Sequence, residues 1–172
     1  QNTLIGGLAG DALTDADYNV AIGFQALTVD TLGGNSVAIG AFALRDQNLT
    51  TATNTYNVAV GYEAGGSINT GVQNTIIGGL AGDAMTSGST NIFVGYSAAG
   101  VGVVTGDSNI AIGGAALGPL TSGSNNIAIG EDAGPGITSG SNNMCLGHDA
   151  GRTGSPGGNI STGSNEIALG DE

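Results

Sequence analysis

The chain of 172 residues contains no lysine and no tryptophan, and it has only two arginines, one histidine, one cysteine and three prolines. Two arginines against 14 acidic residues give a net charge of -12, so a polyanion such as nucleic acid would be repelled. A single cysteine, Cys145, excludes an intrachain disulfide framework. The composition therefore argues against nucleic-acid binding and against a disulfide-stapled scaffold.

Long apolar segments and helical patterns are also missing. No apolar run approaches the ~18 to 20 residues needed to cross a bilayer, and the first residues, QNT, lack the basic and apolar regions of a signal peptide. No apolar periodicity of 3.6 residues persists, and the many glycines and β-branched residues disfavour helix. We expect no membrane insertion and an all-β fold.

What the chain has in abundance is glycine, 34 residues, placed in a recurring pattern. Residues 126–134, NIAIGEDAG, form one copy, and Gly130 serves as its marker. Equivalent glycines are Gly6, Gly23, Gly40, Gly61, Gly78, Gly95, Gly113, Gly147 and Gly170. Six of the nine intervals are 17 residues, and a fixed period of this size is typical of solenoids. We expect one repetitive β-solenoid or parallel β-roll over residues 1–172, with about ten 17-residue rungs.

The residues around each marker predict a short strand. The position just before the glycine is aliphatic in every copy, and the position two residues earlier is mostly β-branched, so both share one face of an extended segment. We expect these two rows to form the core. The small residue between them, usually Ala, then faces the other way and must meet something close. Alanine is also invariant three residues after the marker.

Two further positions support stacking of rungs. Asparagine stands four residues before the marker in eight of ten copies, and stacked amides can form a hydrogen-bonded ladder. Glycine stands seven residues before it in seven of nine copies, where we expect a turn with positive φ. Each unit then comprises a strand, a glycine bend, a short second strand or extended segment, and a turn. The structural repeat residues we expect include Ile22, Gly23, Ala26, Ile39, Gly40, Ala43, Asn126, Ile129, Gly130 and Ala133.

About ten rungs at ~4.8 Å give a rod on the order of 48 Å long. Because the alanine faces must be covered closely, we expect several chains to pack through them around a common axis. The expected assembly is a homotrimer.

The copies NVAIG at 19–23, SVAIG at 36–40 and NIAIG at 126–130 resemble the repeats of trimeric adhesive fibres. Phage tail-fibre shafts carry NxAIGxxA repeats, and head domains of trimeric autotransporter adhesins build a left-handed β-roll from a similar SVAIG motif. The connections TSGSNN at 121–126 and 138–143 favour the tail-fibre group, and the period of 17 departs from the shorter autotransporter repeat. The resemblance implies a shaft that in this group often precedes an autoproteolytic chaperone domain, with processing near the last residues.

No catalytic constellation stands out, and we expect neither an enzyme nor a cofactor. The serines belong to turns without a base at a suggestive spacing. Asp11, Asp83, Asp132 and Asp149 recur near the second bend, but they lack the spacing of calcium-binding β-rolls. We expect a solvated acidic rim and no metal site, with calcium binding as the alternative. Cys145 occupies a slot that is usually Ala, so we expect it to be buried.

Recognition residues are expected where the repeat is interrupted. Longer connections occur at 45–56 and 151–162, and they hold both arginines of the chain. Loops on a rigid scaffold often carry binding. Tyr18 with Phe24, and Tyr56 with Tyr62, flank strands in equivalent places, where rings either stack on a sugar or pack from rung to rung. The candidate receptor-binding residues are Arg45, Asp46, Gln47, Asn48, Tyr56, Tyr62, Tyr96 and Arg152.

The function expected is a structural and adhesive segment of a phage tail fibre that contributes to attachment to a host-surface glycan or protein. Its location would be the virion, or the bacterial cell surface if the chain is an autotransporter-type adhesin. Ice binding is a weaker alternative, suggested by Thr14, Thr31, Thr86, Thr121 and Thr138 at one repeat position. A polysaccharide-degrading enzyme is disfavoured because no copy carries a paired-carboxylate site that the others lack.

Overall fold

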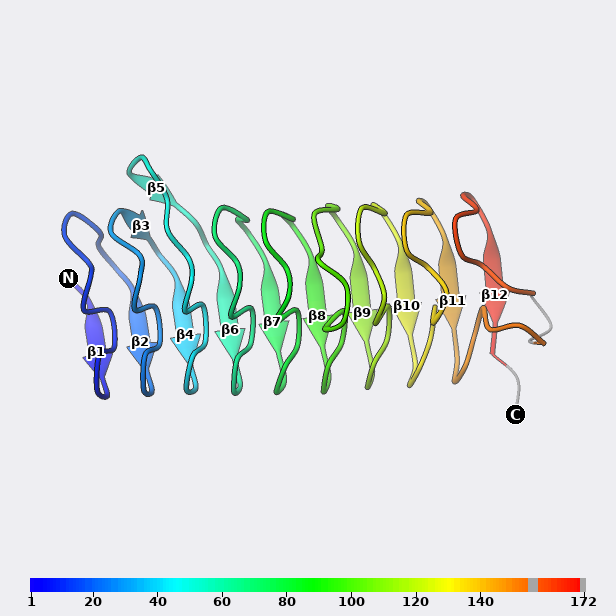
Figure 1. Ribbon diagram of the computed structural model, residues 1–172, viewed down its shortest axis with the longest axis horizontal. Helices are drawn as coiled ribbons and strands as arrows, with labels where there is room; N and C mark the ends of the chain where they lie inside the picture. Colours follow the sequence, from blue (N-terminus) through cyan, green and yellow to red (C-terminus); the bar gives the residue numbers. More distant parts are fainter. Residues whose placement is uncertain (155–157, 171–172) are drawn as a thin grey trace.

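A computed structural model describes residues 1–154 and 158–170 of the chain. The described residues form an all-β, parallel β-solenoid with roughly 17-residue spacing, and its first and last strands lie at opposite ends of a rod (Figure 1). The ten strands of the main sheet are β1 (Thr3–Ile5), β2 (Val20–Ile22), β4 (Val37–Ile39), β6 (Val58–Val60), β7 (Thr75–Ile77), β8 (Ile92–Val94), β9 (Ile110–Ile112), β10 (Ile127–Ile129), β11 (Met144–Leu146) and β12 (Ile167–Leu169). The expected fold class is therefore confirmed.

Equivalent repeat positions pair directly across the sheet. Ala21 lies opposite Ala38, and Ile22 lies opposite Ile39. The same register continues through the inserted residues, because Ala38 pairs with Ala59 although 21 residues separate them. Each repeat position therefore becomes a continuous row of similar side chains along the rod.

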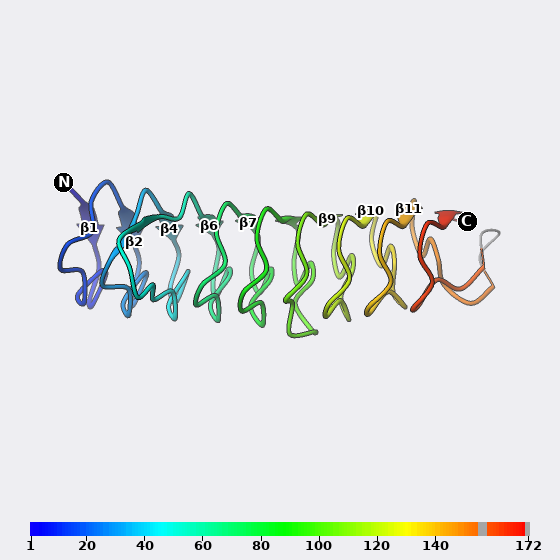
Figure 2. The same cartoon turned by 90° about the horizontal axis from the view of Figure 1, so that it is seen from above.

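The remainder of each turn is mostly turn and bend, and the strands lie along one side of the rod with the connections on the other (Figure 2). Among the described residues a second sheet forms only between β3 (Gly33–Gly34) and β5 (Thr53–Asn54). Backbone hydrogen bonds still join the turns here: the Leu117 N–H donates to the Ala133 carbonyl at 2.9 Å, and the Thr121 N–H to the Thr138 carbonyl at 2.8 Å. The expected second strand is absent from most turns, but the rung-to-rung bonding is present.

The orientation expected for the strand side chains is wrong. The central alanines of the strands, such as Ala38 and Ala128, are fully buried inside the solenoid, whereas Ile39 is only half-buried and Ile129 is 38% exposed. The aliphatic rows therefore point outward. The physical reason is the thinness of the turn: the invariant alanines of the opposite wall, such as Ala133, are buried against the strand interior and leave no room for two rows of branched side chains. These alanines cannot pack against other chains as expected.

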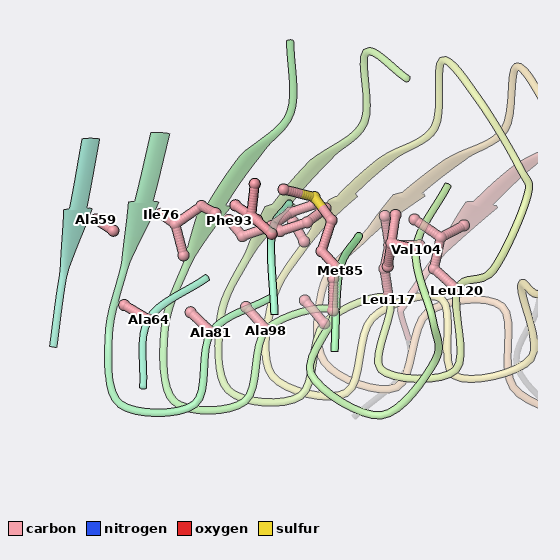
Figure 3. Close-up of a cluster of buried hydrophobic side chains, with 14 of the residues drawn as sticks. Ala59, Ala64, Ile76, Ala81, Met85, Phe93, Ala98, Val104, Leu117 and Leu120 are labelled. Atoms are coloured by element: carbon pink, nitrogen blue, oxygen red, sulfur yellow. The ribbon is translucent and has the colours of Figure 1, made fainter. Parts of the chain in front are cut away.

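The interior is filled by the strand alanines, the alanines after the bend and, in most turns, a larger apolar residue (Figure 3). The larger residues include Ile68, Met85, Leu120 and Ile137, all fully buried. Where the central strand residue has a large side chain, as at Phe93, a glycine on the opposite wall leaves room for it. A Cβ on Gly82 would lie 3.0 Å from Cδ2 of Phe93. The core is therefore packed turn by turn with complementary volumes.

Glycine is required for different reasons at the marker position and at the position seven residues before it. Gly130 has φ +131, and a Cβ there would lie 2.5 Å from the Gly147 carbonyl oxygen of the next turn. Gly123, seven residues earlier, does not have the expected positive φ; its Cβ would lie 2.3 Å from the Gly140 oxygen. In that turn the left-handed residue is Asn125, with φ 59. Close approach of backbones, and not φ, therefore excludes side chains at the second glycine.

The asparagine ladder is present as expected. Asn109 is fully buried, and its Nδ2 donates to the Gly123 carbonyl at 2.9 Å and to Asn91 Oδ1 at 3.1 Å. Its own Oδ1 accepts the Asn126 N–H at 3.0 Å. Each such side chain therefore satisfies backbone groups that the narrow interior would otherwise leave unpaired.

Candidate functional site

Several departures from the repeat coincide in residues 15–57. The chain gains four residues there, the asparagine ladder is interrupted by Ser36, and the large interior position, apolar in most other turns, is held by Asp30 and Gln47. Regularity is what stabilises the rest of the rod, so a local concentration of irregular residues points to a role beyond stability.

Asp30 and Gln47 belong to a fully buried polar cluster with Ser36, Thr55 and Asn57. Gln47 Nε2 donates to Asp30 Oδ2 at 2.6 Å and to Ser36 Oγ at 3.1 Å, while Gln47 Oε1 accepts from Asn57 Nδ2 at 2.9 Å. The hydroxyls of Ser36 and Thr55 also hydrogen-bond each other. Burial of polar groups is costly unless every group is bonded, and here the cluster bonds its members to one another.

This cluster fixes the backbone of β3. Asp30 Oδ1 accepts the Gly33 N–H at 2.9 Å, and Thr55 Oγ1 donates to the Gly34 carbonyl at 3.1 Å. On the other side of β3, the Asn35 N–H donates to the Asp17 carbonyl at 3.0 Å. The inserted segment carrying β5 is thereby held beside β3, where it projects beyond the neighbouring turns (Figure 1).

The projecting segment walls a surface cleft of about 410 Å³ over three consecutive turns. Its lining consists of polar, aromatic and small residues: Asp15, Ala16, Asp17, Tyr18, Leu32, Gly34, Asn35, Ala52, Thr53, Asn54 and Tyr56. The volume lies within the range of about 300 to 1,000 Å³ that is usual for small-ligand sites. The lining carries carboxylates but no cationic side chain.

Tyr18, Asn35 and Tyr56 occupy the same repeat position in the three turns, each with a left-handed backbone. Tyr18 is 60% and Tyr56 53% exposed. Asn35 Nδ2 donates to Asn54 Oδ1 at 2.8 Å, and Asn54 Nδ2 donates to the Tyr56 hydroxyl at 3.4 Å. Among the described residues, no hydrogen bond engages the Asp15 carboxylate, Asn35 Oδ1 or the Tyr18 hydroxyl, while Asp15 and Tyr18 are exposed and Asn35 is half-buried.

Three other aromatic rings, those of Phe24, Phe42 and Tyr62, pack from turn to turn. Phe42 meets Phe24 at 5.5 Å and Tyr62 at 5.9 Å between centroids, both edge to face. Arg45 lies 5.9 Å above the Phe42 ring. Of the two readings of the tyrosine pairs, rung-to-rung packing therefore holds for Phe24 and Tyr62, while Tyr18 and Tyr56 line the cleft.

Of the predicted recognition residues in the first long connection, Arg45, Asp46, Gln47 and Asn48 lie outside the cleft lining. Arg45 Nε and Nη2 each donate to Asp46 at 2.8 Å, and these bonds raise the pKa of Arg45 above its usual value. Arg45 also lines a small hollow of about 80 Å³ with Glu63 and Asp83. Gln47 is fully buried, so it is unavailable to a receptor; the prediction for Gln47 is wrong because its amide completes the buried cluster. Asn48 is exposed and accepts a hydrogen bond from Thr31.

The remaining predicted residues lie apart from one another. Tyr96 is 68% exposed and covers Gly79 of the previous turn, and Arg152 donates to Asp149 Oδ2 at 2.8 Å near the last described turns. Part of the second long connection, residues 155–157, lies outside the described residues. Of the predicted set, Tyr56 alone lines the cleft.

Sequence reasoning missed the cleft residues Asp15, Asp17 and Asn35, and it placed Asn54 in the 45–56 connection without naming it as a candidate. A signal was present: the position five residues before the marker holds tyrosine only in the two turns that flank the cleft, and Gln, Thr, Ser or Asn elsewhere. These side chains come from three different turns, so they become neighbours only when the turns stack, and the sequence alone does not place them together.

Other chemistry is sparse in the part of the chain that the structure describes. No three His, Cys, Asp or Glu side chains gather there as a metal site, and no helix there is long and apolar enough to cross a membrane. Cys145 is fully buried as expected, and burial raises the pKa of its thiol to about 11.

The outward rows form a second candidate surface. They run along β1 to β12, and exposed members include Ile5, Ile77, Ile92, Ile112, Ile129, Met144, Leu146, Ile167 and Leu169. We call these two rows of strand residues the aliphatic face. It shares no residue with the cleft. Continuous apolar surface of this kind usually marks an interaction site.

Comparisons with protein families, with curated proteins and with solved structures give no match to this chain.

Proposed function

We propose that the chain is a non-enzymatic structural and adhesive fibre segment, the shaft of a phage tail fibre that contributes to attachment at a host surface. The observation that carries this proposal is the aliphatic face on a regular solenoid rod. A rod with one continuous apolar face is suited to lateral packing with copies of itself. The NxAIGxxA pattern, which resembles that of tail-fibre shafts, supports the same function.

The size of the aliphatic face fits a self-association surface. Ten strands at ~4.8 Å spacing make it about 43 Å long, and a width of about 10 Å gives on the order of 400 Å². A stable interface buries about 800 Å² per partner, with roughly 55 to 65% apolar area. Each chain of a cyclic trimer forms two such interfaces, so the rows supply about a quarter of the area that one chain buries, and flanking polar turns supply the rest. We propose a homotrimer that packs through this face, in place of the alanine faces.

The threonine row gives less support to ice binding. The Thr14 and Thr121 hydroxyls donate to the carbonyls of Thr31 and Thr138 of the next turn, at 3.0 and 2.9 Å. These hydroxyls serve the rod and are not a free, regular array.

The test is to locate the chain. Purified virions and washed host envelopes from the same culture are digested and analysed by mass spectrometry for peptides of this sequence. The proposal predicts peptides in the virions at a stoichiometry that is a multiple of three. Peptides confined to the outer envelope of uninfected cells would instead indicate the bacterial surface adhesin, and would overturn the tail-fibre assignment.

A further inference from the structure

We propose that the cleft between Tyr18 and Tyr56 binds a neutral saccharide, as a short oligosaccharide of pyranose rings. This inference rests on the proposed attachment function, for which it names the ligand class and the binding residues. It is carried by the cleft geometry, by the groups that line it and by the buried cluster beneath it.

The lining matches the two faces of a sugar ring. Exposed tyrosine rings offer rigid amphipathic surface at low conformational cost, and they suit the C–H face of a pyranose. The Asp15 carboxylate and Asn35 Oδ1, which have no partner among the described residues, are acceptors for sugar hydroxyls. The Asn35–Asn54–Tyr56 hydrogen bonds hold the wall in one arrangement before a ligand arrives.

The charge of the cleft lining disfavours acidic saccharides. The lining includes Asp15 and Asp17 and no cationic side chain, within a chain of net charge -12. The Asp17 carboxylate is paired with the Gln1 ammonium, which leaves Asp15 as the carboxylate without a cationic partner among the described residues. Sialic or uronic acids would bring a carboxylate against the unpaired carboxylate of Asp15, and the ammonium beside Asp17 is already engaged. The ligand favoured by the electrostatics is therefore uncharged.

A peptide fits less well. Extended peptides usually add to an open sheet edge. Here β3 pairs with β5 on one side, and the Asn35 N–H beyond it is bonded to Asp17, so β3 has no free edge at the cleft. Few apolar side chains are present to hold alternate peptide residues, since Leu32 is the only large aliphatic residue in the lining.

Beneath the cleft, the interior of the rod contains buried polar side chains in place of apolar ones, which is unfavourable for stability. Asp30 and Gln47 replace apolar residues in the core, and their hydrogen bonds fix Gly33 and the neighbouring cleft floor. Residues that contact a ligand keep their geometry when the residues behind them hold them by packing and hydrogen bonds.

The chain itself supplies conservative variants. Asparagine holds the position of Tyr18 and Tyr56 in the turns of Asn35, Asn125 and Asn142, with the same left-handed backbone. Tyr18→Asn and Tyr56→Asn therefore remove the rings without straining the fold. Tyr96→Ala is the matched control, because Ala41 holds that position in another turn and Tyr96 lies outside the cleft.

The experiment titrates the full chain with neutral cellotriose, mannotriose and the trimer of N-acetylglucosamine, acidic trigalacturonic acid, and the cationic trimer of glucosamine, and follows the ring signals of its four tyrosines by NMR. At least one neutral probe is expected to shift Tyr18 and Tyr56 but not Tyr62 or Tyr96. Each cleft variant is expected to weaken binding about tenfold, which corresponds to about 1.4 kcal/mol, and Tyr96→Ala to leave it unchanged.

Binding of only the charged probes, shifts centred on Tyr62 or Tyr96, or no shift with any probe at 10 mM would each overturn the saccharide site. The outcome is separable from that of the proposed function. A chain found in virions whose cleft binds no sugar would retain the fibre function and lose this inference, whereas sugar binding by a chain absent from virions would do the reverse.

Discussion

At the scale of single residues, the marker glycines are the positions that tolerate least change. Gly130→Ala would place a Cβ 2.5 Å from the Gly147 carbonyl, at φ +131. Backbone strain of this kind costs ~1 to 3 kcal/mol, and the clash with backbone adds to it. We expect a loss of at least ~3 kcal/mol in the free energy of unfolding, measured by denaturant titration.

The control for this substitution is Gly114→Ala. Its Cβ would meet nothing closer than Glu131 Cγ at 3.9 Å, and Ala41 occupies the same repeat position. This variant should stay within ~0.5 kcal/mol of the original protein. Equal effects of the two substitutions would show that close backbone approach does not govern these turns.

Burial of Cys145 makes the stability of the fold depend on pH. Its thiol pKa is raised to about 11 by burial, whereas an unfolded thiol titrates near ~8.5. Between these values the folded chain keeps a proton that the unfolded chain has lost, so the free energy of unfolding falls as pH rises. We expect a loss on the order of 2 kcal/mol from pH 8 to pH 10.

Cys145→Ala supplies the comparison, since Ala128 and Ala168 hold the slot in the adjacent strands. The difference between the two unfolding free energies, measured across this pH range, should change with pH in the stated direction. Parallel curves, or rapid alkylation of the folded protein at pH 8, would contradict a buried thiol.

At the scale of the element, the asparagine ladder joins each turn to the next. Asn109→Ala leaves the Gly123 carbonyl and the Asn126 N–H without their partners. Each unpaired buried group costs ~1 to 3 kcal/mol, so we expect a loss of ~2 to 5 kcal/mol and faster hydrogen exchange at Asn126.

Asn125→Ser is the matched variant for the ladder. Asn125 is exposed, and Ser108 holds its position in the preceding turn. The free energy of unfolding of Asn125→Ser should be close to that of the original protein. A loss as large as that of Asn109→Ala would mean that the ladder amides contribute no more than surface amides.

The sequence predicted the strands, their register and the ladder, because the 17-residue period places like residues side by side. It did not predict which face of the strand is inside. Alternation in VAIG shows only that Ile22 and Ala21 point opposite ways, and both faces are apolar. The choice depends on the distance to the opposite wall, which Ala26 sets and which only the closed turn reveals.

The cleft was harder to predict than the fold for a related reason. Tyr56 was identified because it ends the long connection, but its partners Asn35 and Tyr18 lie one and two turns away, respectively. Gln47 was misassigned because a polar residue in an inserted segment resembles surface. Only the structure shows that it bonds Asp30 inside the rod.

At the scale of the whole molecule, the aliphatic face links the fold to the fibre. Ile112→Glu combined with Ile129→Glu places charges on neighbouring strands of this face. Both side chains point outward, so the fold should persist while association weakens. Ser122→Glu with Ser139→Glu adds the same charges at exposed turn positions and serves as control.

The most direct test of the account is the mass of the chain in solution, measured by light scattering after size exclusion. The account predicts three times the 16.5 kDa of one chain for the original protein and for the serine control. It predicts the mass of a single chain for the isoleucine variant, with its β circular dichroism retained. A monomeric original protein, or an isoleucine variant that keeps the original mass, would contradict it.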